Sequence, residues 1–213
     1  FIITSLAQAF ITSTYKKYSE VKNEIGMSGA ETARKILDEN GLKNVKVVEV
    51  DGYLSDHYDP AAKVVRLSKT NYSGKSIAGL SVAAHECGHA IQDKENYNFL
   101  KIRSSLVPFV NFSSYAGYLA ILIGGITGLF GLIKIGILLE CVILLFQVVT
   151  LPVEIDASKR ALEEVRRLKY LNEKEYAKGK EVLIAAALTY VASVASTLLQ
   201  ILRLVFMFGR RED

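Results

Sequence analysis

Residues 104–133 read SSLVPFVNFSSYAGYLAILIGGITGLFGLI and contain no Asp, Glu, Lys or Arg. Two more stretches are similarly apolar: 135–153 has Glu140 as its one charged residue, and 182–202 has none. A helix needs roughly 20 mostly apolar residues to cross the hydrocarbon core of a bilayer. We therefore expect three transmembrane helices in the second half of the chain.

The N-terminal residues 1–12 are also uncharged, but they are too few to cross a bilayer alone. We expect residues 1–14 to be part of a first transmembrane helix. The alternative is a short amphipathic helix that lies on the membrane surface. A secretory signal peptide is disfavoured because no basic region precedes the apolar run.

The basic residues are concentrated in two segments. Residues 15–103 and 154–181 together hold 22 of the 26 Lys and Arg residues. Two spans between these segments return the chain to the side that it left, and cytoplasmic segments are enriched in Lys and Arg. Both segments are therefore expected in the cytoplasm. A further span then places Arg210 and Arg211 outside, which weakly opposes the charge rule.

The first basic segment shows the signals of a small α/β unit. Ser28 and Glu31 have the spacing of a capping box ahead of a helical run. Residues 45–50 and 63–68 are typical of β-strands, and the segment between them holds an Asp-Gly turn signal and a helix-breaking proline. Residues 76–92 are apolar with helical period. The expected fold class is mainly α, with integral membrane helices and a small cytoplasmic α/β unit.

The expected organisation follows from these boundaries. The segments are a partial first transmembrane helix (1–14), a cytoplasmic unit (15–103), two transmembrane helices (104–153), a cytoplasmic helical segment (154–181), a transmembrane helix (182–208) and a tail (209–213).

Residues 83–92 read AAHECGHAIQ and carry an HExxH motif. In a helix, His85 and His89 project from one face one turn apart, which allows both imidazoles to bind one Zn²⁺. Glu86 then lies beside the metal, where it can act as a general base toward bound water. The alternative is a chance match on a buried helix, but the uncharged flanks favour a zincin-like site.

A catalytic zinc site needs a third protein ligand. No further His follows His89, so an acid is expected, and Glu154 is the best candidate because the two-span excursion returns it to the same membrane face. Its alternative role is that of an ordinary interfacial acid. Asp156 should face away from a metal bound by Glu154, and Glu140 lies about 21 Å further along a helix.

His57, in the segment SDHYDP, is the remaining histidine. It is a candidate donor to the oxyanion of a tetrahedral intermediate. The favoured alternative is a turn residue, with Asp56 and Asp59 making local turn hydrogen bonds. No Gly-rich phosphate loop and no basic patch with interleaved aromatic residues is present, so no nucleic-acid partner is expected.

Four blocks together resemble the YugP-like neutral zinc metallopeptidases, which are bacterial membrane proteins: SDHYDPAAKVVRLS, AAHECGHAIQ, TLPVEIDASKRAL and AALTYVASVASTLLQILRL. The resemblance extends from about Tyr15 to Arg211. It implies a membrane-embedded, gluzincin-like site with His85 and His89 as ligands, Glu86 as base and Glu154 as third ligand.

The chain is more distantly similar to the HtpX and prenyl-protein (CAAX) membrane proteases. In those proteins an acid four residues after the third ligand orients a histidine, whereas this chain has Ser158 at that position. A carboxylate from this position is therefore absent, and Asp156 or a backbone carbonyl are the substitutes to consider.

The sequence therefore predicts a membrane-bound, zinc-dependent endopeptidase whose metallopeptidase unit is at 15–103. It is expected to be a multi-pass protein of the bacterial inner membrane, with the active site facing the cytoplasm and with polypeptides, including membrane proteins, as substrates. The alternative is a catalytically inactive membrane scaffold or interaction protein with a structural zinc site. The retained Glu86 favours the enzyme, because a structural site has no need of that acid.

Overall fold

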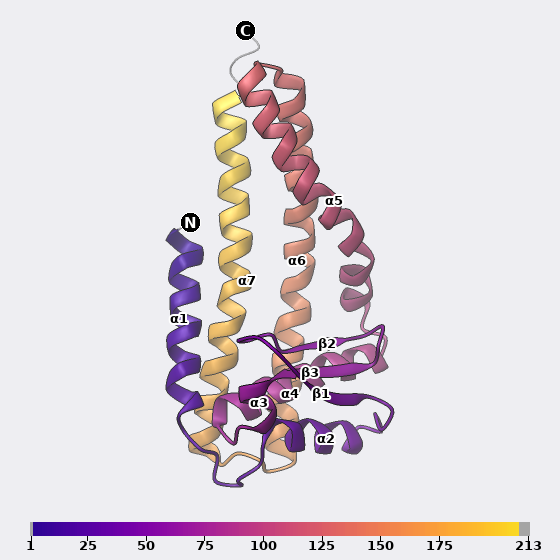
Figure 1. Ribbon diagram of the computed structural model, residues 1–213, viewed down its shortest axis with the longest axis vertical. Helices are drawn as coiled ribbons and strands as arrows, with labels where there is room; N and C mark the ends of the chain where they lie inside the picture. The colour runs from indigo at the N-terminus through magenta and orange to yellow at the C-terminus, as the bar shows by residue number, and fades with distance from the viewer. Residues whose placement is uncertain (1, 209–213) are drawn as a thin grey trace.

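The computed structural model describes residues 2–208 and shows an elongated molecule (Figure 1). Long helices extend from one end, and a small sheet with its short helices occupies the other. The tail expected at 209–213 lies outside the described residues, as does Phe1.

Three helices among the described residues are long and apolar enough to cross a membrane: α5 (Asn98–Thr127), α6 (Phe130–Arg167) and α7 (Glu173–Phe208). Many of their large apolar side chains are exposed, as expected for helices in contact with lipid. The mainly α fold class is thus confirmed. Helix α1 (Ile2–Ser19) packs along α7 (Figure 1), and its role as part of a transmembrane helix stays a prediction.

Helix α6 is continuous across the point where a membrane span was expected to end and a cytoplasmic segment to begin. It passes through Pro152 without interruption and ends at Arg167. Helix α7 begins five residues beyond Leu168, the C-cap of α6, and is likewise one helix. Glu154 is therefore held by the rigid continuation of an apolar helix rather than by a separate segment.

The sheet has three strands in the order β1-β3-β2: β1 (Lys46–Val50) pairs parallel with β3 (Val64–Ser68), and β2 (His57–Asp59) pairs antiparallel with β3. The two expected strands are confirmed. The favoured interpretation of His57 as a turn residue is wrong, because His57 lies in the edge strand β2 opposite Arg66.

The turn lies immediately after β2. Asp59 Oδ1 accepts hydrogen bonds from the backbone N–H groups of Ala61 and Ala62, and Lys63 adopts a positive φ of 52°. This tight reversal folds β2 back onto β3. The expected turn hydrogen bonds of Asp59 are therefore present, but they close a hairpin.

The remaining helices enclose the core of this unit. Helix α2 (Gly29–Glu39) begins with the expected capping box between Ser28 and Glu31, and α3 (Lys69–Ser73) follows the sheet. Helix α4 (Ile77–Lys94) packs against α2, α6 and α7 and is buried over most of its surface. The uncharged flanks of the HExxH motif are thus explained by contact with other helices on several sides.

Candidate metal centre

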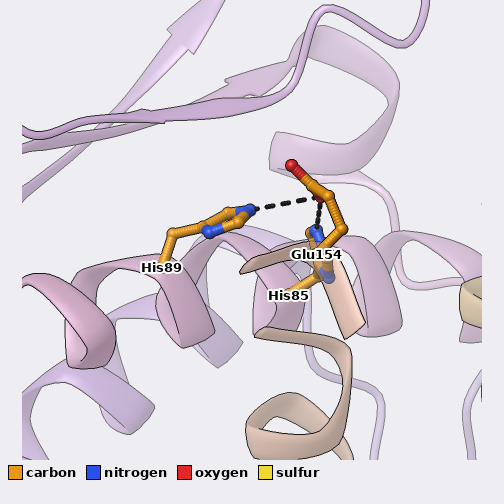
Figure 2. Close-up of side chains that lie close together, drawn as sticks. All are labelled: His85, His89 and Glu154. Atoms are coloured by element: carbon orange, nitrogen blue, oxygen red, sulfur yellow. Dashed lines mark hydrogen bonds and ion pairs between the residues drawn. The ribbon is translucent and has the colours of Figure 1, made fainter. Parts of the chain in front are cut away.

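The two motif histidines lie one turn apart on α4 and point toward the same carboxylate (Figure 2). The Nε2 atoms of His85 and His89 lie 3.2 Å and 3.5 Å from Glu154 Oε2. The two rings are nearly perpendicular, with centroids 4.8 Å apart. Four-residue spacing on a helix is what places both rings on one face.

The structure brings all three expected ligands together. Donor atoms of His85, His89 and Glu154 lie within 4.8 Å of one another, the one such group of His, Cys, Asp and Glu side chains in residues 2–208. Two imidazoles and a carboxylate are the donor set of many catalytic zinc sites. These residues therefore fit a zinc ion. Glu140 and Asp156 are not in the group, as the helical spacing predicts.

Neighbouring polar groups fix both rings. The hydroxyl of Ser158 lies 3.1 Å from His85 Nδ1, and Gln92 Oε1 lies 3.0 Å from His89 Nδ1. The Gln92 oxygen can only accept, so His89 carries a proton on Nδ1 and its Nε2 is free to bind a metal, and the Ser158 hydroxyl can accept from Nδ1–H of His85 in the same way. Both imidazoles therefore present Nε2 to the position between them and Glu154.

Gln92 links this arrangement to α6. The side chain is fully buried, and its Nε2 donates to the backbone carbonyl of Val153 and to Asp156 Oδ2, both at 2.8 Å. Asp156 thus supports His89 through Gln92 rather than directly. Sequence reasoning missed Gln92, although a polar residue three positions after a motif histidine on an apolar helix is a usable signal.

Glu86 is 7% exposed and is one of three acids that are buried among residues 2–208. Burial raises the pKa of its carboxyl group, against the opposing effect of His85 and His89. For His89, burial would lower the pKa, but the hydrogen bond and the charge of Glu154 reverse the sign and raise it. A carboxylate with a raised pKa is suited to accept and then release a proton near neutral pH.

Two cavities meet at this group of side chains. The larger cavity, about 380 Å³, is bounded by β2 and α5 and includes His57, Tyr58, Arg103 and Ser104. The smaller cavity, about 280 Å³, is bounded by α1, α4 and α7. The residues that line both cavities are Asp56, His85, Glu86, Glu154 and Tyr190. The metal centre is thus reached from two sides.

The comparisons with known proteins agree with this geometry. A family model described as putative neutral zinc metallopeptidase matches residues 1–209. The chain belongs to that family. It is also 46% identical over 209 residues to the putative membrane protease YugP of Bacillus subtilis (strain 168), covering 97% of this chain and 93% of that protein. No solved structure matches.

Membership of this family confirms the resemblance seen in the sequence. The described part of the chain has both a donor set that fits zinc and three helices apolar enough to cross a membrane. The likeness to a membrane protease indicates membrane association.

Three further residues of the centre lie on separate elements. His57 is exposed at the larger cavity, with Nδ1 2.8 Å from the carbonyl oxygen of Ser55. Arg103 Nη1 lies 3.8 Å from Glu154 Oε1. Tyr190 of α7 lines both cavities and interacts with Glu154. Sequence reasoning named His57 but missed Arg103 and Tyr190. Arg103 is one of many basic residues in its segment, and Tyr190 is one aromatic residue within an apolar span, so neither stands out in the sequence.

Asp56 does not make the local turn hydrogen bonds that the sequence suggested. Its carboxylate accepts from the backbone N–H and the hydroxyl of Ser68 and from Asn71 Nδ2. These bonds fasten the chain ahead of β2 to the end of β3 and to α3. Asp56 thus fixes the wall of the larger cavity.

Proposed function

We propose that the protein is a membrane-bound, zinc-dependent endopeptidase. The observation that carries this proposal is the buried carboxylate of Glu86 beside a group of three metal donors that two cavities reach. A structural zinc site is normally closed by four protein ligands, whereas a catalytic site keeps a position for water. The three donors therefore favour the enzyme over the scaffold.

The chemistry follows from where the donors and Glu86 lie. A zinc ion held by His85, His89 and Glu154 would polarise the scissile carbonyl and lower the pKa of a bound water. Glu86 accepts a proton from the attacking water and delivers it to the leaving amine. Ser158 and Gln92 keep the two imidazoles aligned during this exchange.

The substrate is an extended polypeptide. Strand β2 is at the edge of the sheet and its residues His57 and Tyr58 line the larger cavity. An exposed edge strand offers main-chain hydrogen bonds to an extended peptide with little sequence preference. A peptide paired with β2 passes the donors and continues toward the smaller cavity.

The orientation in the membrane follows from charge. The end of the molecule that carries the sheet also carries most of the basic residues, while Lys134 lies near the turn at the far end of α5 and α6 (Figure 1). Because cytoplasmic segments attract Lys and Arg, we place the sheet and the metal centre in the cytoplasm of a multi-pass inner-membrane protein.

One substitution separates enzyme from scaffold. Glu86→Gln should retain bound zinc but lower the cleavage of unfolded casein by at least about 100-fold, the size of a general-base contribution. Glu163→Gln, at an exposed position of α6, is the matched control and should cleave normally. Equal casein cleavage by wild type and Glu86→Gln would refute the proposal.

A further inference from the structure

A groove about 550 Å³ in volume lies between α6 and α7, and it combines a basic end with an apolar wall. We call it the α6–α7 groove, and its defining residues are Lys159, Arg166, Lys180, Ile155, Ile184 and Leu188. It adjoins the smaller cavity, because Ser158, Leu183 and Ala187 line both.

The basic end of the groove holds three cations from two helices. On α6, Lys159 is 3.8 Å from Glu163, but both side chains are largely exposed, so that pair is weak. Arg166 lies over the ring of Tyr176 at 4.3 Å and also pairs with Glu173 at 3.2 Å, but both side chains of that pair are exposed, so it is weak as well. Lys180 of α7 has no acidic partner among the described residues. The groove thus has a surplus of positive charge at this end.

The apolar wall continues directly from the charges along each helix. On α7, Lys180, Ile184, Leu188 and Val191 follow one another at spacings of four, four and three residues, so they share a face. The three apolar side chains remain between 42% and 48% exposed. They offer an apolar surface that no described part of the chain covers.

Helix α6 is less regular: Ile155 lies beyond Lys159, but Leu162 separates the cations Lys159 and Arg166. Ile155, Lys159, Leu162 and Arg166 lie on one face at helical spacing. Because α6 and α7 run in opposite directions (Figure 1), the charged ends of both faces meet at the end that carries the sheet. Charge and apolar surface are therefore arranged along the groove as in a phospholipid.

We propose that the α6–α7 groove binds an anionic phospholipid of the bilayer. The phosphate lies between Lys159, Arg166 and Lys180, and an acyl chain runs along Ile184 and Leu188 into the membrane. Basic pockets between membrane helices on the cytoplasmic side are suited to anionic head groups. The inference rests on the proposed membrane placement but not on peptidase activity.

The test is native mass spectrometry of the full chain, titrated in detergent with phosphatidylglycerol or phosphatidylcholine. Wild type should retain one phosphatidylglycerol in preference to phosphatidylcholine. Each lysine near the head group contributes about a 5-fold gain in affinity, so Lys159→Gln with Lys180→Gln should weaken retention roughly 25-fold. The control pair is Lys101→Gln with Lys174→Gln, which removes equal charge outside the groove and should leave retention unchanged.

Several outcomes would overturn the proposal. Equal weakening by the two pairs would show general surface attraction, and displacement by millimolar glycerol 3-phosphate would show a site for a free phosphate. Equal retention of both lipids would remove the charge argument. Lipid retention does not depend on catalysis, so Glu86→Gln should retain the lipid as wild type does. Failure of this proposal would appear in the lipid titration, whereas failure of the peptidase proposal would appear in the casein assay of Glu86→Gln.

Discussion

The backbone of Gly88 on α4 lies against the carbonyl of Ala157 on α6. A Cβ atom at Gly88 would be 2.4 Å from that oxygen, closer than real Cβ atoms approach. Glycine is therefore required for the two helices to touch here. Ala157 is three residues after Glu154, about one turn, so this contact places Glu154 over the two motif histidines.

Gly88→Ala should push α6 away from α4. We expect a loss of about 1–3 kcal/mol in the free energy of unfolding, as for other overpacked cores, together with weaker zinc binding. Thermal unfolding in detergent and zinc competition with a chromophoric chelator measure the two effects. Gly131→Ala is the control, because its Cβ would meet nothing within 4 Å. Zinc affinity equal to wild type in Gly88→Ala would show that the contact does not position Glu154.

Ser158, four residues after Glu154 on α6, supports His85 through its hydroxyl, which lies 3.1 Å from Nδ1. Removing the hydroxyl in Ser158→Ala should weaken zinc binding by roughly 10-fold, within the usual range for groups that orient a ligand. Ser158→Asp should bind zinc at least as tightly as wild type, because a carboxylate is a stronger acceptor for Nδ1–H. The control is Ser193→Ala, because the hydroxyl of Ser193 donates to the backbone carbonyl of Thr189 on its own helix. Unchanged affinity in Ser158→Ala would rule out the supporting role.

As pH decreases, zinc affinity should begin to fall at a pH above the ordinary pKa range of a histidine. In the metal-free protein Glu154 raises the pKa of His89 despite burial, and an imidazole must lose its proton to bind metal. The ion pair between protonated His89 and Glu154 stabilises the metal-free fold at low pH. This contribution is lost as pH rises through the raised pKa of His89. Chelator competition between about pH 5.5 and 8 measures the effect. A constant affinity down to pH 6.5, the ordinary pKa of histidine, would contradict it.

The sequence was informative where a local pattern has a direct structural cause. The spacing of His85 and His89 fixes a shared helix face, Ser28 with Glu31 forms the capping box, and the stretches with at most one charged residue become long apolar helices. Glu154 was reached by topology, because two spans must return the chain to the side that it left.

The contacts that complete the centre depend on tertiary packing. Strand β2 is three residues long, too short for an alternating pattern, and it forms because the Asp59 turn folds it onto β3. Gln92 supports His89 only because α6 passes beside it. Tyr190 lies within an apolar span, where a tyrosine is unremarkable in sequence. Only the packing of α4 between α6 and α7 brings these groups together.

His57, Arg103 and Tyr190 line the larger cavity as donors that an oxyanion could meet, and substitutions of His57 and Tyr190 compare two of them. The carbonyl of Ser55 can only accept, so Nδ1 of His57 donates to it. Nε2 of His57 can then donate only in the imidazolium form, whereas the Tyr190 hydroxyl donates without a change of charge. Tyr190→Phe should therefore lower kcat for peptide cleavage by about 100-fold.

His57→Ala should lower kcat by less than Tyr190→Phe does, because Nε2 of His57 carries a proton only in the imidazolium form. Zinc content is measured in parallel for both variants, because Tyr190 also interacts with Glu154, and a drop in kcat counts only at full zinc content. If His57→Ala leaves peptide hydrolysis unchanged, the oxyanion role of His57 fails.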